Sequence, residues 1–490
     1  MSKFHSTVSR RDFMKALGLG AAGLGAAGAA SPVFHDFDEI VASPKGAGEK
    51  RPWWQREREY LNPVTQIDWN VMQRFGDYNN FTGHLTSEEN NFRETRRVAL
   101  RKKSILDHRI GFTLRDYALR VACWGPVTNG RVSTMMTGVD PRFAGENNHL
   151  LFGDLQHFQV NAGFPKWQGS PEENSRMLRT ACRYCGGGTV GFGELIEGKT
   201  KKMVFRNQPM TGTQSFEFED VDEPYQVPYQ KYVTPNKYRY AIVCNVNQDI
   251  THMRLAPSAL SEAAVARGYD QADILNYRIL AFLKVLGYGG VGADITGMVP
   301  RPGWGEIAGL GEVGRIHELI TPETGPLFRE SHVIFTDLPL APTNPIEFGA
   351  SRFCTTSCLK CADLCPNLAI QYGDKKWDMT PSTATDGNPD HLKPELFNNP
   401  GHETWWLNHF ACKDYWVQIE TGCSICAGEC VFTKERMASI HEFVKPIVSL
   451  TSLFNGFFYN MDVAFGYGCL PEERWNDFWE EDRPIVGLNY

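Results

Sequence analysis

The chain has 490 residues, a formal net charge of −7 and a hydrophobic fraction of 42%. A negative balance argues against nucleic acid as the natural partner, and a chain of this length can bury a large core without a disulfide framework. After residue 43 no segment reaches about 18 consecutive apolar residues, so the sequence predicts no transmembrane helix there.

The N-terminus has the pattern of a twin-arginine export signal. Arg10 and Arg11 precede a Gly/Ala-rich apolar run from Ala16 to Ala30, which is too short and too rich in glycine for a stable membrane span. An amphipathic N-terminal helix is the alternative. We expect residues 1–43 to form a cleaved signal that exports the protein in its folded form, with the cut between residues 30 and 43.

The remaining chain divides into four regions by composition and pattern. Residues 44–180 are aromatic and charged, and we expect irregular structure there. Residues 181–340 carry strand and helix patterns, and residues 341–440 hold two cysteine runs. Residues 441–490 are again aromatic and are expected to wrap back over the core.

The pattern within 181–340 predicts a mixed core of the α/β or α+β class. Runs of β-branched and aromatic residues predict strands at 189–196, 202–206, 238–246 and 332–338. A helix is predicted to begin after Pro257-Ser258 and to end at Gly287. Apolar residues in its second half share one face; they are Leu275, Ile279, Phe282, Leu283 and Leu286.

Eight of the thirteen cysteines form two short runs near the C-terminal end. The first run is C-x3-C-x2-C-x3-C followed by proline, and the second is C-x10-C-x2-C-x3-C. Their C-x2-C-x3-C core is that of the bacterial two-cluster ferredoxins, in which the last cysteine of a run ligates the other cluster. We therefore predict two 4Fe–4S clusters, one on Cys354, Cys358, Cys361 and Cys430, the other on Cys365, Cys412, Cys423 and Cys426.

Disulfides and zinc are the other interpretations of these cysteines. Disulfide frameworks suit small secreted chains, and zinc ribbons use well-separated C-x2-C pairs rather than a tight triple. The x10 gap between Cys412 and Cys423 departs from the ferredoxin spacing. We expect the other five cysteines to be core residues, because free cysteine is usually buried; they are Cys123, Cys182, Cys185, Cys244 and Cys469.

With these features in order, the chain resembles the corrinoid- and iron–sulfur-dependent reductive dehalogenases of anaerobic organohalide-respiring bacteria. Its N-terminal segment looks most like that of the enzymes from Chloroflexi. Beyond the signal and the cysteine runs, the resemblance is carried by four pieces in a fixed order. They are Phe282-Leu283-Lys284 with Leu286-Gly287-Tyr288, then Ala308 to Arg315, Thr324 to Arg329, and Phe335 to Leu340.

The resemblance implies a nitroreductase-like corrinoid-binding core over 181–340 and a ferredoxin-like module over 341–440. It implies a cobalamin-type corrinoid bound base-off without a histidine ligand, which fits the absence of an Asp-x-His-x-x-Gly motif. It also implies removal of halogen from a small organohalide, a chlorinated ethene, alkane or aromatic, as the last step of anaerobic respiration. The expected partners are a respiratory electron donor and a small hydrophobic anchor protein at the outer face of the cytoplasmic membrane.

The family also implies which residues carry the chemistry. In the family a tyrosine near the corrinoid donates the proton, and a nearby arginine or lysine lowers its pKa, since a fixed cation stabilises phenolate. Counting from the Phe282 and Gly287 landmarks places this tyrosine at Tyr269, with Tyr277 as the alternative, and the cation at Arg329. Without the resemblance, both would be interpreted as surface residues.

The corrinoid contacts are harder to infer from the sequence. Glycine lets a backbone approach a large group closely, which makes Gly309, Leu310, Gly311 and Gly314 the candidates, although such turns are common in any α/β fold. Thr296 is the candidate near the position where some family members have a pocket asparagine.

Two other functions share part of this pattern. An epoxyqueuosine-reductase-like enzyme has the same cofactors but acts on transfer RNA, and it would be cytoplasmic with a basic surface. An exported ferredoxin-type electron carrier would not need the large core before the clusters. The export signal and the negative charge favour the dehalogenase prediction over both.

Overall fold

The computed structural model describes residues 51–74, 87–123, 166–207, 215–227, 230–292, 298–330, 333–378, 398–434 and 439–480. The predicted signal with Arg10 and Arg11, and the candidate Thr296, lie outside these ranges.

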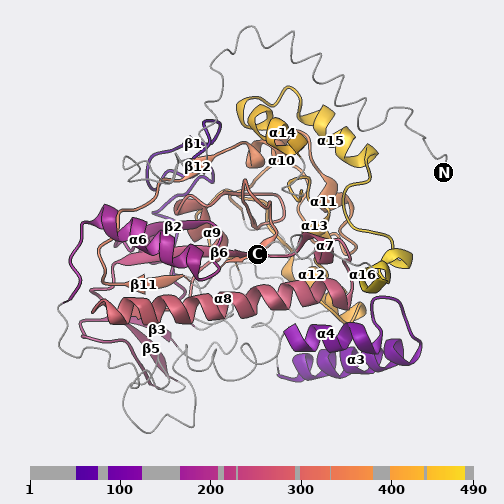
Figure 1. Ribbon diagram of the computed structural model, residues 1–490, viewed down its shortest axis with the longest axis horizontal. Coiled ribbons are helices and arrows are strands. Elements are labelled where there is room, and N and C mark those ends of the chain that lie inside the picture. The colour runs from indigo at the N-terminus through magenta and orange to yellow at the C-terminus, as the bar shows by residue number, and fades with distance from the viewer. Residues whose placement is uncertain are drawn as a thin grey trace.

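An antiparallel sheet lies at the centre of the molecule (Figure 1). Its long middle strand is β6 (Tyr240–Asn247), which pairs along one edge with β2 (Val190–Glu194). Along the other edge it pairs with β10 (Phe328–Glu330) and then β11 (Ile334–Thr336), and β11 pairs with β7 (Gly290–Val291). The side chains of β6 are buried on both faces of the sheet, because Ala241 and Val243 pack into one core cluster and Ile242, Cys244 and Val246 into another.

Three of the four predicted strands are confirmed as β2, β6 and β11. The strand predicted at 202–206 is wrong, because the chain there forms the 3₁₀ turn η3 (Thr200–Met203). The Thr200 hydroxyl closes this turn by donating to the Glu194 carbonyl at 2.5 Å and accepting from the Ile196 amide at 2.7 Å. The apolar residues that suggested a strand, Met203 to Phe205, instead fill the core.

The predicted helix is confirmed as α8 (Ala259–Val285). The Ser258 hydroxyl accepts from the Ser261 amide and Ser261 bonds back to the Ser258 amide, which satisfies two free N–H groups at the start of the helix. Gly287, with φ +85°, lies just beyond its end. The predicted apolar face packs against β6, and α6 (Pro171–Tyr184) lies alongside with Leu178 in the same core (Figure 1).

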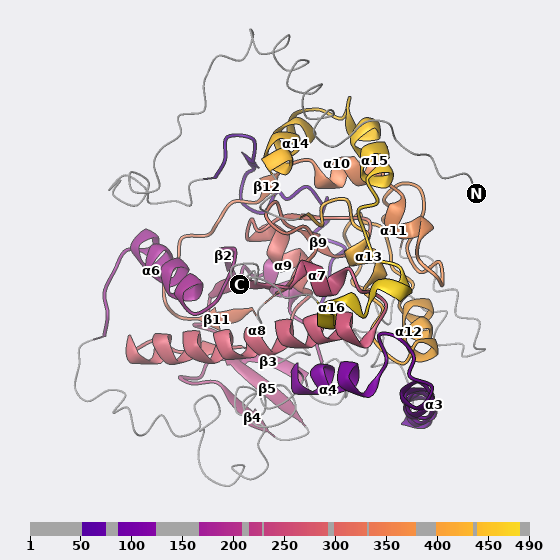
Figure 2. The same cartoon turned by 45° about the vertical axis from the view of Figure 1, so that its right-hand side comes forward.

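The expectation of irregular structure over 44–180 is wrong for much of its described part. Residues 87–123 form α3 (Ser87–Leu106) and α4 (Leu114–Cys123), and most of α6 also falls in this region. Figure 2 shows α4 beside one end of α8 and α3 next to it. We call α3, α4 and the turn between them the α3–α4 hairpin.

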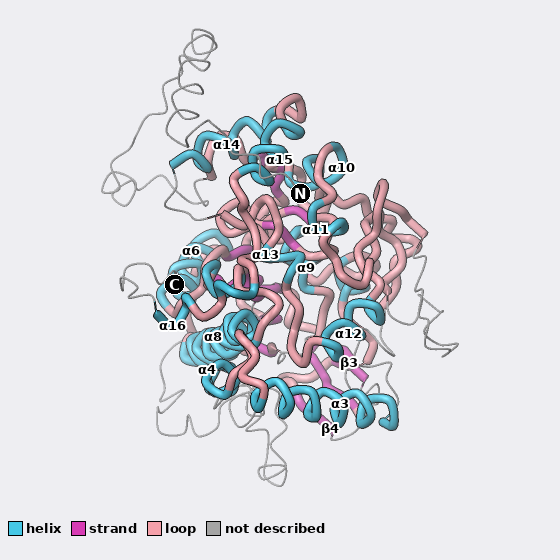
Figure 3. The backbone as a smooth tube through the Cα atoms, turned by 90° about the vertical axis from the view of Figure 1, so that its right-hand side faces the viewer, coloured by secondary structure: helices cyan, strands magenta, loops and turns pink. Residues whose placement is uncertain are grey.

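The cysteine-bearing segments consist of short helices joined by loops (Figure 3). The helices are α10 (Ala350–Thr356), α11 (Lys360–Asp363), α12 (His409–Gln418) and α13 (Ile425–Gly428). The smaller elements are β1 (Arg56–Glu57) with β12 (Ile346–Glu347), β8 (Glu312–Val313) with β9 (Leu319–Ile320), the sheet of β3 (Ser215–Glu219), β4 (Tyr225–Val227) and β5 (Lys231–Pro235), and the helices α7 (Ile250–Met253) and α9 (Arg301–Ile307).

The described part of the C-terminal segment packs against two parts of the chain. Val448 of α14 (Ser439–Leu450) and Phe458 of α15 (Asn455–Ala464) pack against Phe353 and Cys358. Trp475, in the 3₁₀ turn region before α16 (Asp477–Glu480), packs on Phe112 between α3 and α4, with ring centroids 6.2 Å apart. None of the described helices is both long enough and apolar enough to cross a membrane.

Candidate active site and cysteine centres

The structure brings the eight predicted ligand thiols together in two sets of four. The first set contains Cys354 of α10, Cys361 of α11, and Cys358 and Cys430 from the loops that follow α10 and α13. Burial raises the pKa of the Cys361 thiol, and the neighbouring Cys354, Cys430 and Cys358 raise it further. Burial and then Cys354 likewise raise the pKa of Cys430. These four thiols are therefore close enough to influence one another's pKa.

The second set contains Cys412 of α12, Cys426 of α13, and the loop residues Cys365 and Cys423. Burial raises the pKa of Cys412 to about 12, with further contributions from Cys426 and Cys365. Burial also raises the pKa of Cys423, and Cys426, Cys412 and Cys365 raise it further. The last cysteine of each run thus interacts mainly with the other run's cysteines, while the assignment of the eight thiols to two clusters stays a prediction.

The two sets are neighbours. Cys361 of the first set and Cys365 and Cys426 of the second pack in one apolar cluster, and Cys426 also raises the pKa of Cys361 after burial and the nearer thiols. The Ala369 amide donates to Cys365 Sγ at 3.2 Å. Within the described ranges, no three His, Cys, Asp or Glu side chains converge closely enough to hold a single metal ion.

Glu312, which sequence reasoning did not single out, holds the start of α10. Its fully buried carboxylate accepts from the backbone amides of Phe348, Gly349 and Ser351, the last two at 2.7 and 2.8 Å. Burial raises the pKa of Glu312, and these three hydrogen bonds lower it. The carboxylate satisfies the free N–H groups at the start of the helix that carries Cys354.

Arg315, also missed, holds the loop of the first cysteine run. Its buried guanidinium donates to the carbonyls of Cys354 at 2.7 Å and Cys358 at 3.2 Å, and to those of Gln371 and Gly373 at 3.0 and 2.8 Å. It also lies over the ring of Trp405, 4.9 Å from the centroid. One side chain therefore joins the backbone of two predicted ligands to the chain segment after them.

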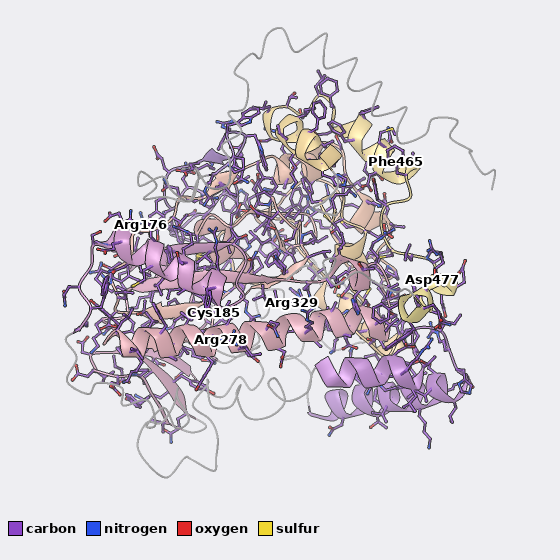
Figure 4. All side chains as sticks on the ribbon, viewed as in Figure 1. Arg176, Cys185, Arg278, Arg329, Phe465 and Asp477 are labelled. Carbon is purple, nitrogen blue, oxygen red and sulfur yellow. The ribbon has the colours of Figure 1, made fainter. Side chains whose placement is uncertain are left out.

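Tyr269 and Arg329 lie in contact, although 60 residues separate them in the sequence. Arg329 is in β10, opposite Val246 of β6, and its guanidinium carbon is 5.1 Å from the centroid of the Tyr269 ring on α8. Figure 4 shows Arg329 beside the middle of α8. Arg329 Nε is buried and has no hydrogen-bond partner within the part of the chain that the structure describes.

Gly268 makes this contact possible. A Cβ atom at position 268 would lie 2.8 Å from Arg329 Cγ, which is closer than real Cβ contacts allow, and a tight 3.2 Å from Gln248 Cγ. A residue with a side chain at 268 would therefore push Arg329 away from Tyr269. Tyr277, the alternative donor, lies eight residues further along α8, about two turns away.

Glu318 connects this pair electrostatically to the second thiol set. It directly precedes β9, and its side chain is accessible to solvent although desolvation by the surrounding protein raises its pKa. Arg329 and Arg301 oppose that rise, while Glu318 itself contributes to the raised pKa of Cys426. Glu318 thus interacts electrostatically with Arg329 on one side and with Cys426 of the second set on the other.

The glycines proposed as corrinoid contacts are packed against protein on their Cβ side. A Cβ atom would lie 2.2 Å from the Asn344 carbonyl oxygen at Gly309, which has φ +75°, 2.0 Å from the Ile320 carbonyl oxygen at Gly311, and 2.3 Å from Ile320 Cδ1 at Gly314. Leu310 is fully buried in the core. The groups that closely approach these glycines on the Cβ side therefore belong to the protein itself. A cofactor could reach only the N–H and C=O groups of these residues.

Two of the remaining cysteines are core residues, as predicted. Cys182 of α6 and Cys244 of β6 are buried, and a hydrogen bond between their thiols is the largest cause, ahead of burial, of the raised pKa of Cys182. Cys185 and Cys469 are half-buried. The side chain of Cys123 lies outside the described part.

Comparison with known proteins identifies the family. The model of the family described as reductive dehalogenase subunit matches residues 50–340. A chloroethene reductive dehalogenase of Dehalococcoides mccartyi strain VS is 30% identical, and the alignment covers 100% of this chain and 99% of the relative. A trichloroethene reductive dehalogenase of another strain of that species is 27% identical, with 99% of each chain covered.

The chain therefore belongs to the reductive dehalogenase family, whose members are oxidoreductases that act on carbon–halogen bonds. This membership favours the dehalogenase prediction over the two alternatives. A solved reductive dehalogenase, described for B12-dependent dehalogenation, matches with a TM-score of 0.52 at 19% identity, over 84% of this chain and 49% of its own. The chain spans about half the length of that structure, and the likeness confirms the mixed α/β fold.

Proposed function

We propose that this enzyme removes halogen from a small organohalide, with chlorinated ethenes as the first candidates, in the terminal step of anaerobic organohalide respiration. The net reaction is R–X + 2e⁻ + H⁺ → R–H + X⁻. The names of the two full-length relatives support the substrate class. The observation that carries the proposal is the contact of Tyr269 with Arg329, because it places a cation against a possible proton donor in a chain whose eight cysteines can supply an electron route.

Two 4Fe–4S clusters would be held by the two sets of thiols, one cluster on each set. Four thiolates are the ligand count of such a cluster, and the eight cysteines supply it twice. The contact between Cys361 and the second set offers a short route for electrons from the first cluster to the second. An external respiratory donor would reduce the first cluster.

A bound corrinoid would supply a reduced cobalt centre able to break the carbon–halogen bond. The described residues near Arg329 fit such a ligand, because Gln248 Oε1 and Arg329 Nε are buried polar atoms without hydrogen-bond partners in the described chain. Buried polar groups of this kind normally have a partner, and the peripheral amides of a corrinoid are suitable ones. The core over 181–340 would then be nitroreductase-like, and residues 341–440 a ferredoxin-like module.

Tyr269 would donate the proton that replaces the halide, and Arg329 would stabilise the phenolate that remains. A guanidinium over a phenol ring favours negative charge on that ring, since it is attracted to the π face and to the phenolate alike. The same guanidinium can attract the departing halide. The negative charge of Glu318 would partly balance the positive charges of Arg329 and Arg301.

The mature enzyme would work at the outer face of the cytoplasmic membrane. The twin-arginine pattern supports export after the clusters are inserted. A small hydrophobic membrane protein would anchor it there.

The cofactor assignment predicts a metal content. We expect anaerobically purified enzyme to contain about eight iron atoms per chain, from the ligand count of two cubanes, and about one cobalt. Elemental analysis measures both metals, and the visible spectrum should show corrinoid bands that clusters alone do not give. Fewer than about four iron atoms after full reconstitution would rule out the two-cluster assignment.

The export assignment predicts where the precursor accumulates. Replacing Arg10 and Arg11 together by lysine should leave the precursor uncut inside the cell, because the twin-arginine route requires the arginine pair and not only positive charge. Cell fractionation followed by detection of the precursor and the mature form measures this. The wild-type chain, made in the same cells, is the control, and normal export of the double variant would disprove the twin-arginine assignment.

A further inference from the structure

The ten-residue gap between Cys412 and Cys423 has a structural counterpart. The helix α12 occupies 409–418, and the chain then turns back at Glu420, a non-glycine residue with φ +67°. That backbone conformation costs energy for any residue with a side chain. The loop that ends in Cys423 is therefore maintained by contacts from elsewhere in the fold.

Those contacts come from the α3–α4 hairpin. The buried Glu420 carboxylate accepts from Ser104 Oγ at 2.5 Å and from the Tyr117 hydroxyl at 3.1 Å. The Glu420 carbonyl accepts from Arg97 Nε at 3.1 Å and Arg101 Nη2 at 3.4 Å. Four side chains of the hairpin thus bind one residue, three positions before a predicted cluster ligand.

The same hairpin also binds the helix that carries Cys412. Arg93 of α3 forms an ion pair with Asp414 of α12, and the two helices are in contact. Two positions within the long gap, Asp414 near its start and Glu420 near its end, are therefore held by α3. The insertion that distinguishes this chain from the ferredoxin spacing is therefore bound to the N-terminal helix α3 and is not an independent loop.

A second buried carboxylate extends this link to α8. Glu262, in the first turn of α8, accepts from Arg120 Nη2 at 2.7 Å, from Arg97 Nη2 at 3.4 Å and from the hydroxyl of Thr421. Glu262 and Tyr269 are seven residues apart, which is about two turns and the same side of the helix. Arg97 therefore connects the loop before Cys423, through the Glu420 carbonyl, with the helix of Tyr269, through the Glu262 carboxylate.

We propose that the α3–α4 hairpin positions the second cluster relative to Tyr269, with Glu420 and Glu262 as the positioning residues. This inference rests on the proposed function, because it needs a cluster on Cys365, Cys412, Cys423 and Cys426. The hairpin would then be part of the redox site, although no residue of it ligates iron. The charge on Glu420 would also act on the cluster, because nearby charge is one of the factors that set an iron–sulfur potential.

The test is a redox titration of the purified enzyme, with the electron paramagnetic resonance signals of the two reduced clusters followed separately. In Glu420→Gln the shape and the bond from Ser104 are kept, and one negative charge is lost. We expect the midpoint potential of the second cluster to become more positive and that of the first to stay unchanged. Lys103→Ala is the control, since it removes an exposed ion pair from α3 without touching Glu420.

A lower melting temperature with both potentials unchanged would overturn the inference, because the hairpin would then only stabilise the fold. If Glu420→Gln does not fold, Tyr117→Phe removes one hydrogen bond to the same carboxylate, and a smaller shift of the second cluster alone is expected. Wild-type enzyme is titrated alongside. If it shows no second cluster, the cluster assignment and this inference both fail, whereas two normal clusters with no shift in either variant refute only the inference.

Discussion

Tyr269→Phe should lose most dehalogenation while the iron and cobalt content stays at the wild-type level. Removing a general acid typically lowers a rate by about 10²–10⁴-fold, and phenylalanine keeps the ring that packs against Arg329. The loss should therefore appear in turnover rather than in cofactor content. Halide release with a reduced dye as electron donor measures the rate, and elemental analysis on the same sample checks the cofactors.

Tyr277→Phe is the matched control, since it makes the same change on the same helix about two turns away. It should retain near-normal turnover. If Tyr277→Phe were inactive and Tyr269→Phe active, Tyr277 and not Tyr269 would be the proton donor. If both variants were active with full cofactors, a tyrosine donor would not apply to this enzyme.

Variants of Arg329 should follow an order set by charge. Arg329→Lys retains a cation near the phenol and should be less impaired than Arg329→Met, although lysine lacks the planar group that lies over the ring. The same rate measurement gives the order. Gly268→Ala probes the same contact without changing either residue, because its Cβ atom would displace Arg329. An Arg329→Met enzyme as active as Arg329→Lys would contradict a role for the charge.

The predictions that the structure confirms rest on local signals. Ser258, Gly287 and the apolar spacing between them define α8 within one stretch of sequence, and the β-branched run of β6 is readable for the same reason. The strand prediction at 202–206 is wrong because the apolar residues there enter the core from a turn and not from a strand. The Thr200 hydroxyl stabilises this turn. Hydrophobicity alone does not separate these two cases.

The residues that sequence reasoning missed act over long distances in the chain. Glu420 meets Ser104 across 316 residues and Tyr117 across 303, and no spacing rule links positions so far apart. The contact of Tyr269 with Arg329 was found only because the family supplied the landmarks. In the glycine pieces, the sequence correctly indicates close approach at Gly309 and Gly311, but it does not reveal that the approaching group is the protein backbone.

Arg315→Met should prevent stable assembly of the first cluster and abolish dehalogenation with it. The substitution leaves four carbonyls without their charged donor. The two buried ones belong to the ligands Cys354 and Cys358. Each hydrogen bond to a charged group contributes about 1.5–3 kcal/mol. It also removes the cation that lowers the pKa of both thiols against the effect of burial. A cluster needs thiolates, so both effects act against it.

Iron analysis and the resonance signals of the two reduced clusters measure the outcome. We expect iron to fall from about eight to about four atoms per chain, with the second cluster's signal retained if the fold survives. Arg74→Met is the matched control, because Arg74 also donates to three backbone carbonyls but in segments without a predicted ligand. It should lower stability and leave both clusters in place. Arg315→Lys should be intermediate, since lysine keeps the charge but cannot span carbonyls on both sides of the loop. Full iron content and two unchanged signals in Arg315→Met would show that the cysteine loop keeps its shape without this arginine.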